Sequence, residues 1–149
     1  MALKTYHAAA DRRENLQVEV KARNFSLIVD EPEQSGGNNQ GMNPVEMLLG
    51  SIAACQTITA AIYADFYGIT LEELRVEVEG DMDSDGFSGA DPAVRPGFQK
   101  IRSTFHIKSS APRIQLVQLL KMVEKQCPVG DSIGHGVSFD EPVLDLSGV

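Results

Sequence analysis

One segment, Met42–Ile69, limits the folds that this chain can adopt more than any other. It reads "MNPVEMLLGSIAACQTITAAIYADFYGI" and carries only two charged side chains in 28 positions. Asn43 is a favourable N-cap, Pro44 suits the first helical position, and Gly68 is typical of a helix C-terminus. Small and apolar residues occupy most sides of this helix, so the segment predicts a long buried central helix against which the other elements pack.

The remaining segments predict an α+β fold. Alternating apolar and polar residues indicate N-terminal antiparallel strands, and the one-residue bridge between two of them suggests a tight hairpin. Further strands follow the central helix, and a second amphipathic helix follows those strands. The expected strands are 16–23, 25–32, a weaker one within 3–10, one from Leu74, one from Phe98 and two short ones within 136–146, and the expected second helix is 112–126.

Composition limits the partners. The 149 residues are 42% hydrophobic and carry a formal net charge of −8, as expected for one globular domain over residues 1–149. An acidic chain lacks the lysine and arginine surplus that phosphate binding needs, so we expect no nucleic-acid partner. The polar N-terminus does not resemble a signal peptide, and the longest apolar run, Met47–Cys55, is short for a membrane span, so we expect no membrane partner and a cytoplasmic location.

The two cysteines, Cys55 and Cys127, are the leading candidates for chemistry. As free thiols on apolar helix faces they are either buried structural residues or a reactive thiol and a resolving thiol that oxidise to a disulfide. Cys55 lies about 16 Å beyond the helix start, so a reactive Cys55 would need an arginine from elsewhere. Pro128 predicts a short helix whose N-cap is Cys127, where amide donors favour a thiolate.

Two motifs together resemble the OsmC/Ohr family of osmotically induced and organic-hydroperoxide-resistance proteins. They are the helix "MNPVEMLLGSIAAC" with the later "YGI", and the segment "KQCPVGDSI". The loop "DMDSDGFSGADPAVRPGFQKIRS" is similar to OsmC-like proteins rather than to Ohr proper. The resemblance implies an OsmC-like fold, an intertwined homodimer, and reduction of small hydrophobic organic hydroperoxides with electrons from a dithiol donor.

The resemblance also assigns roles to residues. Cys55 would be the peroxidatic thiol and Cys127 the resolving thiol, and an Arg–Glu pair would activate Cys55. The family's glutamate position holds Val45, and Glu46 follows it, either as part of a catalytic pair or as a capping-box carboxylate. The candidate activating arginines are Arg12, Arg13 and Arg23.

A rival interpretation is a non-enzymatic OsmC-fold protein that binds a small hydrophobic ligand. Val45 in the family's glutamate position favours this interpretation.

Another motif, "DMDSDG" at residues 81–86, matches the opening of a calcium loop. Its twelfth position is Pro92 rather than a glutamate, which favours an acidic surface turn. His7, His106 and His135 lack the spacing of metal ligands. We therefore expect no metal and no cofactor.

Overall fold

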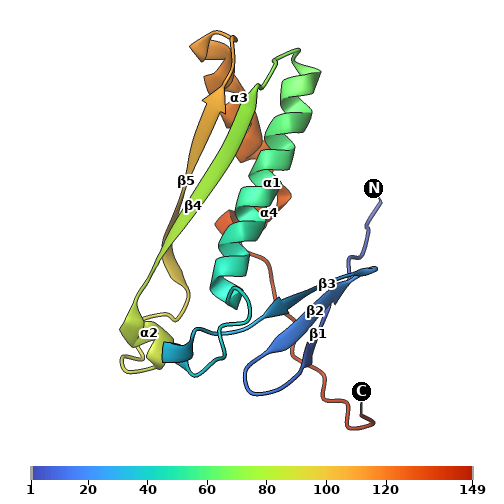
Figure 1. Ribbon diagram of the computed structural model, residues 1–149, viewed down its shortest axis with the longest axis vertical. Coiled ribbons are helices and arrows are strands. Elements are labelled where there is room, and N and C mark those ends of the chain that lie inside the picture. Colours follow the sequence, from blue (N-terminus) through green and yellow to red (C-terminus); the bar gives the residue numbers. More distant parts are fainter. Residues whose placement is uncertain (1, 149) are drawn as a thin grey trace. The chain divides into compact units, whose positions relative to one another are not determined.

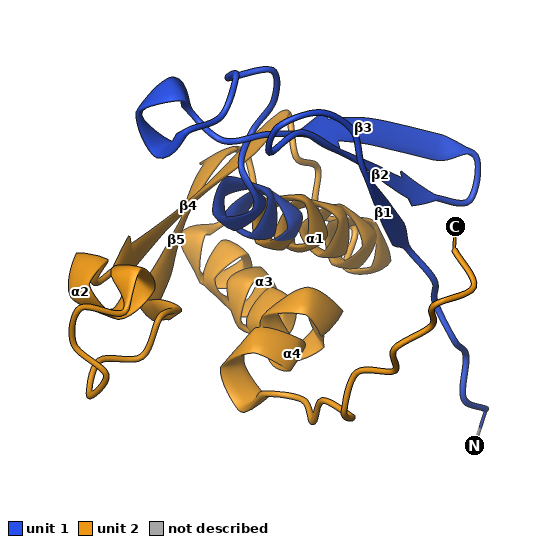
Figure 2. Ribbon diagram, turned by 90° about the horizontal axis from the view of Figure 1, so that it is seen from below, with its two compact units in different colours: residues 1–51 blue, residues 52–149 orange. Residues whose placement is uncertain are grey.

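The structure is a computed structural model that describes residues 2–148. It divides into two compact units, residues 1–51 and 52–149, and helix α1 runs through the boundary between them (Figure 2). The elements, labelled in Figure 1, are β1 (Ala9–Arg12), β2 (Val18–Ala22), β3 (Phe25–Val29), the 3-10 turn η1 (Glu33–Ser35), α1 (Pro44–Phe66), β4 (Glu73–Met82), α2 (Ser84–Ser88), β5 (Phe98–Lys108), α3 (Arg113–Gln126) and α4 (Pro128–His135).

The first unit holds an antiparallel sheet in the order β1–β2–β3. The predicted hairpin is present, and its turn contains Arg23 in the left-handed backbone region at a φ of 55°. The weak first strand lies later than its sequence suggested, because β1 starts at Ala9 and pairs Arg12 with Val18. The α+β class and the N-terminal antiparallel strands are therefore confirmed.

Asp30 organises the loop between β3 and α1. This carboxylate is 1% exposed. Its Oδ1 accepts a hydrogen bond from the Glu31 amide at 2.8 Å, and its Oδ2 accepts from the amides of Asn38 and Gln40 at 3.2 and 3.1 Å. Gly37 belongs to the same loop, and a Cβ there would lie 2.0 Å from the Glu31 carbonyl oxygen. A buried charge and a close backbone approach thus fix the chain that leads into α1.

The start of α1 is a reciprocal capping box, as the sequence predicts. The Asn43 side-chain oxygen accepts from the Glu46 amide at 2.9 Å, and the Glu46 carboxylate accepts from the Asn43 amide at 2.8 Å. These two bonds satisfy amide groups that a helix start otherwise leaves without partners. The same helix ends at Phe66, two residues before Gly68, whose φ of 67° is left-handed, and the Ile69 amide donates to the Ala64 carbonyl.

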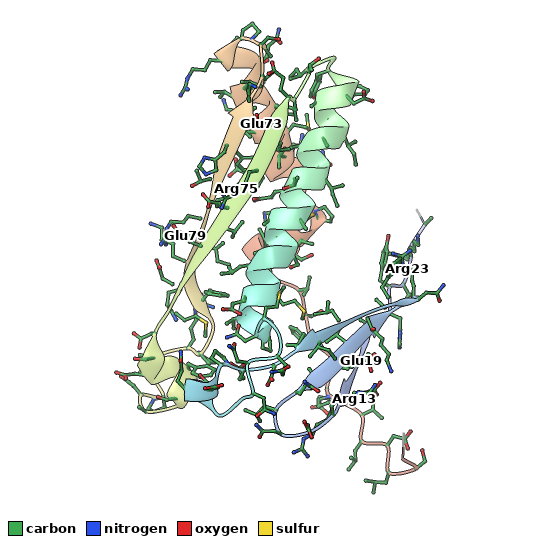
Figure 3. The ribbon with its side chains drawn as sticks, viewed as in Figure 1. Arg13, Glu19, Arg23, Glu73, Arg75 and Glu79 are labelled. Atoms are coloured by element: carbon green, nitrogen blue, oxygen red, sulfur yellow. The ribbon has the colours of Figure 1, made fainter. Side chains whose placement is uncertain are left out.

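The second unit contains a long β4–β5 hairpin together with the three remaining helices. Its strands pair from Glu73 with Lys108 to Met82 with Phe98, and burial alternates along both strands. Glu73, Arg75 and Glu79 project from the charged face of this hairpin (Figure 3). Leu119 of α3 packs against Ala64 and Ile69 to form a small core at the end of α1.

The structure modifies the expectation of a buried central helix. Within the single chain α1 buries only Ile52, Thr59, Ala60 and Ala64. Its length of 23 residues and its mean hydropathy of 1.5 also fit a membrane-crossing helix, although the core helices of soluble proteins meet the same criterion. The two C-terminal strands that we expected are wrong for the described residues, because 136–148 form neither helix nor strand.

Replacing Asp30 by asparagine tests the role of the buried carboxylate. The new amide group would point N–H donors at backbone N–H donors, so we expect a loss of about 2–3 kcal/mol in the free energy of unfolding. Urea unfolding at one fixed protein concentration measures it. Asp11→Asn is the matched control, since Asp11 forms an exposed ion pair with Lys21 at 3.0 Å and should lose under about 1 kcal/mol. Equal losses in the two variants would contradict the assigned role.

Candidate functional site: a pair of thiols

The two cysteines, 72 residues apart in sequence, meet in the second unit. Cys55 lies on α1, and Cys127 lies at the junction of α3 and α4. The Cys127 Sγ donates a hydrogen bond to the Cys55 Sγ over 3.0 Å. A disulfide needs about 2.05 Å between sulfur atoms, so an approach of about 1 Å would close the bond. Both thiols are free in this structure.

The local sequence determines how Cys127 is held. It ends α3 and is the N-cap of α4, with Pro128 at the first helical position, as the sequence predicts. Its Sγ accepts a hydrogen bond from the Gly130 amide at 3.3 Å. A Cβ on Gly130 would lie 3.4 Å from that sulfur, so the absence of a side chain permits this close approach.

The two thiols differ in environment. Cys127 is 1% exposed, and burial is the main cause that raises its pKa above the ordinary thiol value. The hydrogen bond with Cys55 raises the pKa of Cys127 further, while the amides of Gly130 and Val129 act in the opposite direction. Cys127 therefore holds its proton more tightly than an ordinary thiol. In the hydrogen bond between the two sulfur atoms Cys127 is the donor, and Cys55, which is half-buried, is the acceptor.

A largely apolar pocket of about 540 Å³ adjoins Cys127. Its polar lining includes Gln56, Ser103, Lys121 and Glu124. The Oε1 atom of Gln56 is buried and has no hydrogen-bond partner within residues 2–148. The apolar lining comes from four elements, namely Ile52 of α1, Ile101 and Phe105 of β5, Val117, Leu120 and Val123 of α3, and Ile133 of α4.

The other predicted site residues have partners of their own within the first unit. Glu46 belongs to the capping box of α1. Arg12 donates from Nε to the Asn15 carbonyl at 3.0 Å, and Arg13 forms an ion pair with Glu19 (Figure 3). The Arg23 guanidinium lies over the Phe25 ring, 4.9 Å from its centroid. Whether any of the three arginines activates Cys55 stays a prediction.

Sequence reasoning missed several residues around the thiols. Gln56 follows Cys55 directly and offered no signal beyond that adjacency, and Gly130 lies within the quoted "KQCPVGDSI" without having been singled out. The alternative calcium motif has a structural explanation, since Asp83 is the N-cap of α2 and its Oδ1 accepts from the Asp85 amide at 2.9 Å. Residues 2–148 contain no group of three His, Cys, Asp or Glu side chains that could hold a metal ion.

Comparison with known proteins places this geometry in a family. The chain is 24% identical over 139 residues to a hydroperoxide reductase of Mycoplasma genitalium, covering 91% of this chain and 90% of that protein. The OsmC-like protein of Mycoplasma pneumoniae has a similar fold, with a TM-score of 0.76, 23% identity and 88% of each chain covered. The organic hydroperoxide resistance protein OsmC of Legionella pneumophila matches with a TM-score of 0.62 and 24% identity, over 89% of this chain and 91% of that one.

The family model described as OsmC-like protein matches residues 36–141, which contain α1, the β4–β5 hairpin and both cysteines. The fold match shows that this chain, with its N-terminal strands, long central helix, hairpin and further helices, has an OsmC-like fold. The resemblance that the motifs around Cys55 and Cys127 suggested is therefore confirmed, and the chain belongs to the OsmC-like protein family.

Proposed function

We propose that this chain reduces organic hydroperoxides, with Cys55 as the attacking thiol and Cys127 as the resolving thiol. The observation that carries the proposal is the 3.0 Å contact between the two sulfur atoms. Hydroperoxide reductases are among the full-length relatives, which supports the same reaction class. The apolar pocket beside Cys127 offers a surface for the organic part of such a substrate.

The proposed reaction has two steps. The Cys55 thiolate attacks the terminal oxygen of the hydroperoxide, the O–O bond breaks, and the alkoxide leaves and takes up a proton to become an alcohol. Cys55 is now a sulfenic acid. Cys127, as a thiolate, then attacks the Cys55 sulfur, the S–O bond breaks, and hydroxide leaves as water after protonation. An external dithiol would reduce the resulting disulfide and restore both thiols.

The hydrogen bond between the thiols supports this order of the two roles. Cys127 donates to Cys55, and burial keeps the pKa of Cys127 high, so Cys127 is poorly suited to attack first. Its position at the N-cap of α4, where the Gly130 amide contacts the sulfur, would stabilise the thiolate once it forms. With only two cysteines in 149 residues the chain is not a disulfide scaffold, which supports a cytoplasmic location.

Single replacements of the cysteines test the proposal. Cys55→Ser should abolish consumption of cumene hydroperoxide in the presence of a dithiol. Cys127→Ser should still react once and then stop as a sulfenic acid, which a 1,3-diketone probe traps and mass spectrometry detects. The two variants are controls for each other, because each replaces one of the two cysteines by serine. Undiminished turnover by Cys55→Ser, or no sulfenic acid in Cys127→Ser, would refute the assigned roles.

Glu46 either caps α1 or takes part in activating Cys55, because the family's glutamate position holds Val45. A glutamine also serves a capping box, so we expect Glu46→Gln to oxidise at the same rate as the parent protein. If Glu46 instead orients an arginine over Cys55, its loss should slow oxidation at least tenfold, or about 1.4 kcal/mol in the barrier. Stopped-flow measurement of thiol loss distinguishes the two cases. Glu46→Ala is the control that removes the cap, and it should lower stability by about 1 kcal/mol.

The exposed apolar side of α1 supports a homodimer. Ile58, Ile62 and Phe66 are spaced four residues apart, lie on one stripe of the helix, and are 60%, 61% and 77% exposed. The C-terminal segment adds further exposed apolar residues, including Phe139 at 92% and Leu146 at 85%. A second copy of the chain would cover such surface, as in obligate homodimers, whose interfaces are more apolar than other protein surfaces.

Sedimentation velocity at micromolar concentration tests the dimer. We expect the parent protein to sediment as a dimer and Ile62→Glu to weaken association at least tenfold, because the new charge would lose its water at the interface. Phe87→Glu is the matched control, since Phe87 is 70% exposed on α2, away from α1 in sequence. A monomeric parent protein would rule the proposal out.

The rival proposal is that the same fold binds a small hydrophobic ligand without turnover. Val45 in the family's glutamate position and the apolar pocket of about 540 Å³ favour it. The two proposals differ in the cysteine experiments above, because a binding protein would retain ligand affinity when either thiol is replaced and would consume no peroxide.

A further inference from the structure

A second pocket, of about 480 Å³, lies in the second unit between the end of α1 and α3. Tyr67 and Ile69 line it from the turn after α1, and α3 contributes Gln115, Gln118, Lys121, Met122 and Lys125. Neither cysteine is among its lining residues. The wall of this second pocket contains two lysines and no acidic side chain, whereas the pocket beside Cys127 is lined by both Lys121 and Glu124.

The two lysines form a local cationic site in an acidic chain. Lys121 and Lys125 are four residues apart on α3, so their side chains are neighbours on the helix surface. Both side chains are exposed, and neither belongs to an ion pair within residues 2–148. No acidic side chain lines this cavity, so two neighbouring ammonium groups there would favour an anionic occupant over a cationic one.

The other lining residues combine polar and apolar groups, namely the amides of Gln115 and Gln118, the phenol of Tyr67, and the apolar side chains of Ile69 and Met122. Ile69 is 8% exposed and packs with Ala64 and Leu119 in the small core at the end of α1, so this core extends to the pocket wall. Met122 adds a flexible thioether that adapts to the shape of a ligand. A purely inorganic anion would leave these apolar groups unused, and a neutral hydrocarbon would leave the lysines unpaired. The wall therefore fits a molecule that has both an anionic group and a hydrocarbon group.

We propose that this pocket binds an organic carboxylate with a short hydrocarbon chain. Lys121 and Lys125 pair with the carboxylate, and Ile69 and Met122 contact the chain. Lysine binds carboxylate as a point charge, so the attraction is salt-dependent. Lys121 also lines the pocket beside Cys127, which makes it a shared wall of the two cavities. The proposal concerns binding alone and does not depend on whether the thiols reduce peroxides.

Isothermal titration calorimetry of the reduced, full-length protein tests the proposal with three probes. Octanoate carries both parts of the ligand, 1-octanol carries the chain alone, and inorganic phosphate carries charge alone. We expect octanoate to bind at least fivefold more tightly than either of the others, and its affinity to fall as salt rises. None of the probes oxidises thiols, so the result is independent of the peroxidase assay.

Matched lysine variants locate the site. The double variant Lys121→Gln with Lys125→Gln should weaken octanoate binding about tenfold and leave the affinity for 1-octanol unchanged. Lys100→Gln is the single-charge control, because it removes one positive charge from β5 and Lys100 does not line the pocket; its octanoate affinity should equal that of the parent. The proposal is overturned if the parent protein does not bind octanoate, if it binds 1-octanol equally well, or if the double variant and Lys100→Gln behave alike.

Discussion

The contact between Cys127 and Cys55 is the interaction on which the account of the site depends. It joins the middle of α1 to the junction of α3 and α4, and the donor thiol is itself the N-cap of α4. Cys127 is thus the C-cap of α3 and the N-cap of α4, and its sulfur contacts the second thiol. Burial and the hydrogen bond raise the pKa of Cys127, while the Gly130 amide lowers it. The two-step reaction proposed for this pair would use such a difference between two otherwise identical groups.

The helix α1 carries the second constraint. Its low charge places Cys55 in an apolar setting, but the single chain covers only part of the helix. The small residues near Cys55 allow close approach of Cys127, and the larger apolar residues further along remain exposed. Burying a stripe such as Ile58, Ile62 and Phe66 would gain roughly 1.5–3 kcal/mol for each side chain. Such burial would offset part of the cost of association in the proposed homodimer.

Local features of this structure were predictable because their causes lie within a few residues. The capping box at Asn43 and Glu46, the helix end at Gly68 and the N-cap at Cys127 all follow from short-range hydrogen bonding and backbone preference. The family followed from two motifs rather than from periodicity. The two predicted C-terminal strands are absent, because alternation alone does not make a strand. A strand also requires a partner with which to pair, and 136–148 pairs with none among residues 2–148.

The geometry between distant segments could not be read from the sequence. Nothing local predicts that residue 55 meets residue 127, or that Gln56 has a buried oxygen without a partner. The position of Lys121 could not be read from its neighbours in sequence either, because it lines two cavities only through the packing of α3. Such placements depend on tertiary packing, which propensity and periodicity do not describe.

The most direct test of the central claim is the intact mass of the protein after treatment with one equivalent of an organic hydroperoxide and then with an alkylating reagent. If Cys55 and Cys127 act as a redox pair, the protein should lose two hydrogens, take up no alkyl group and remain a single chain, because one intramolecular disulfide has formed. Two alkyl groups on every chain after peroxide treatment would contradict the account.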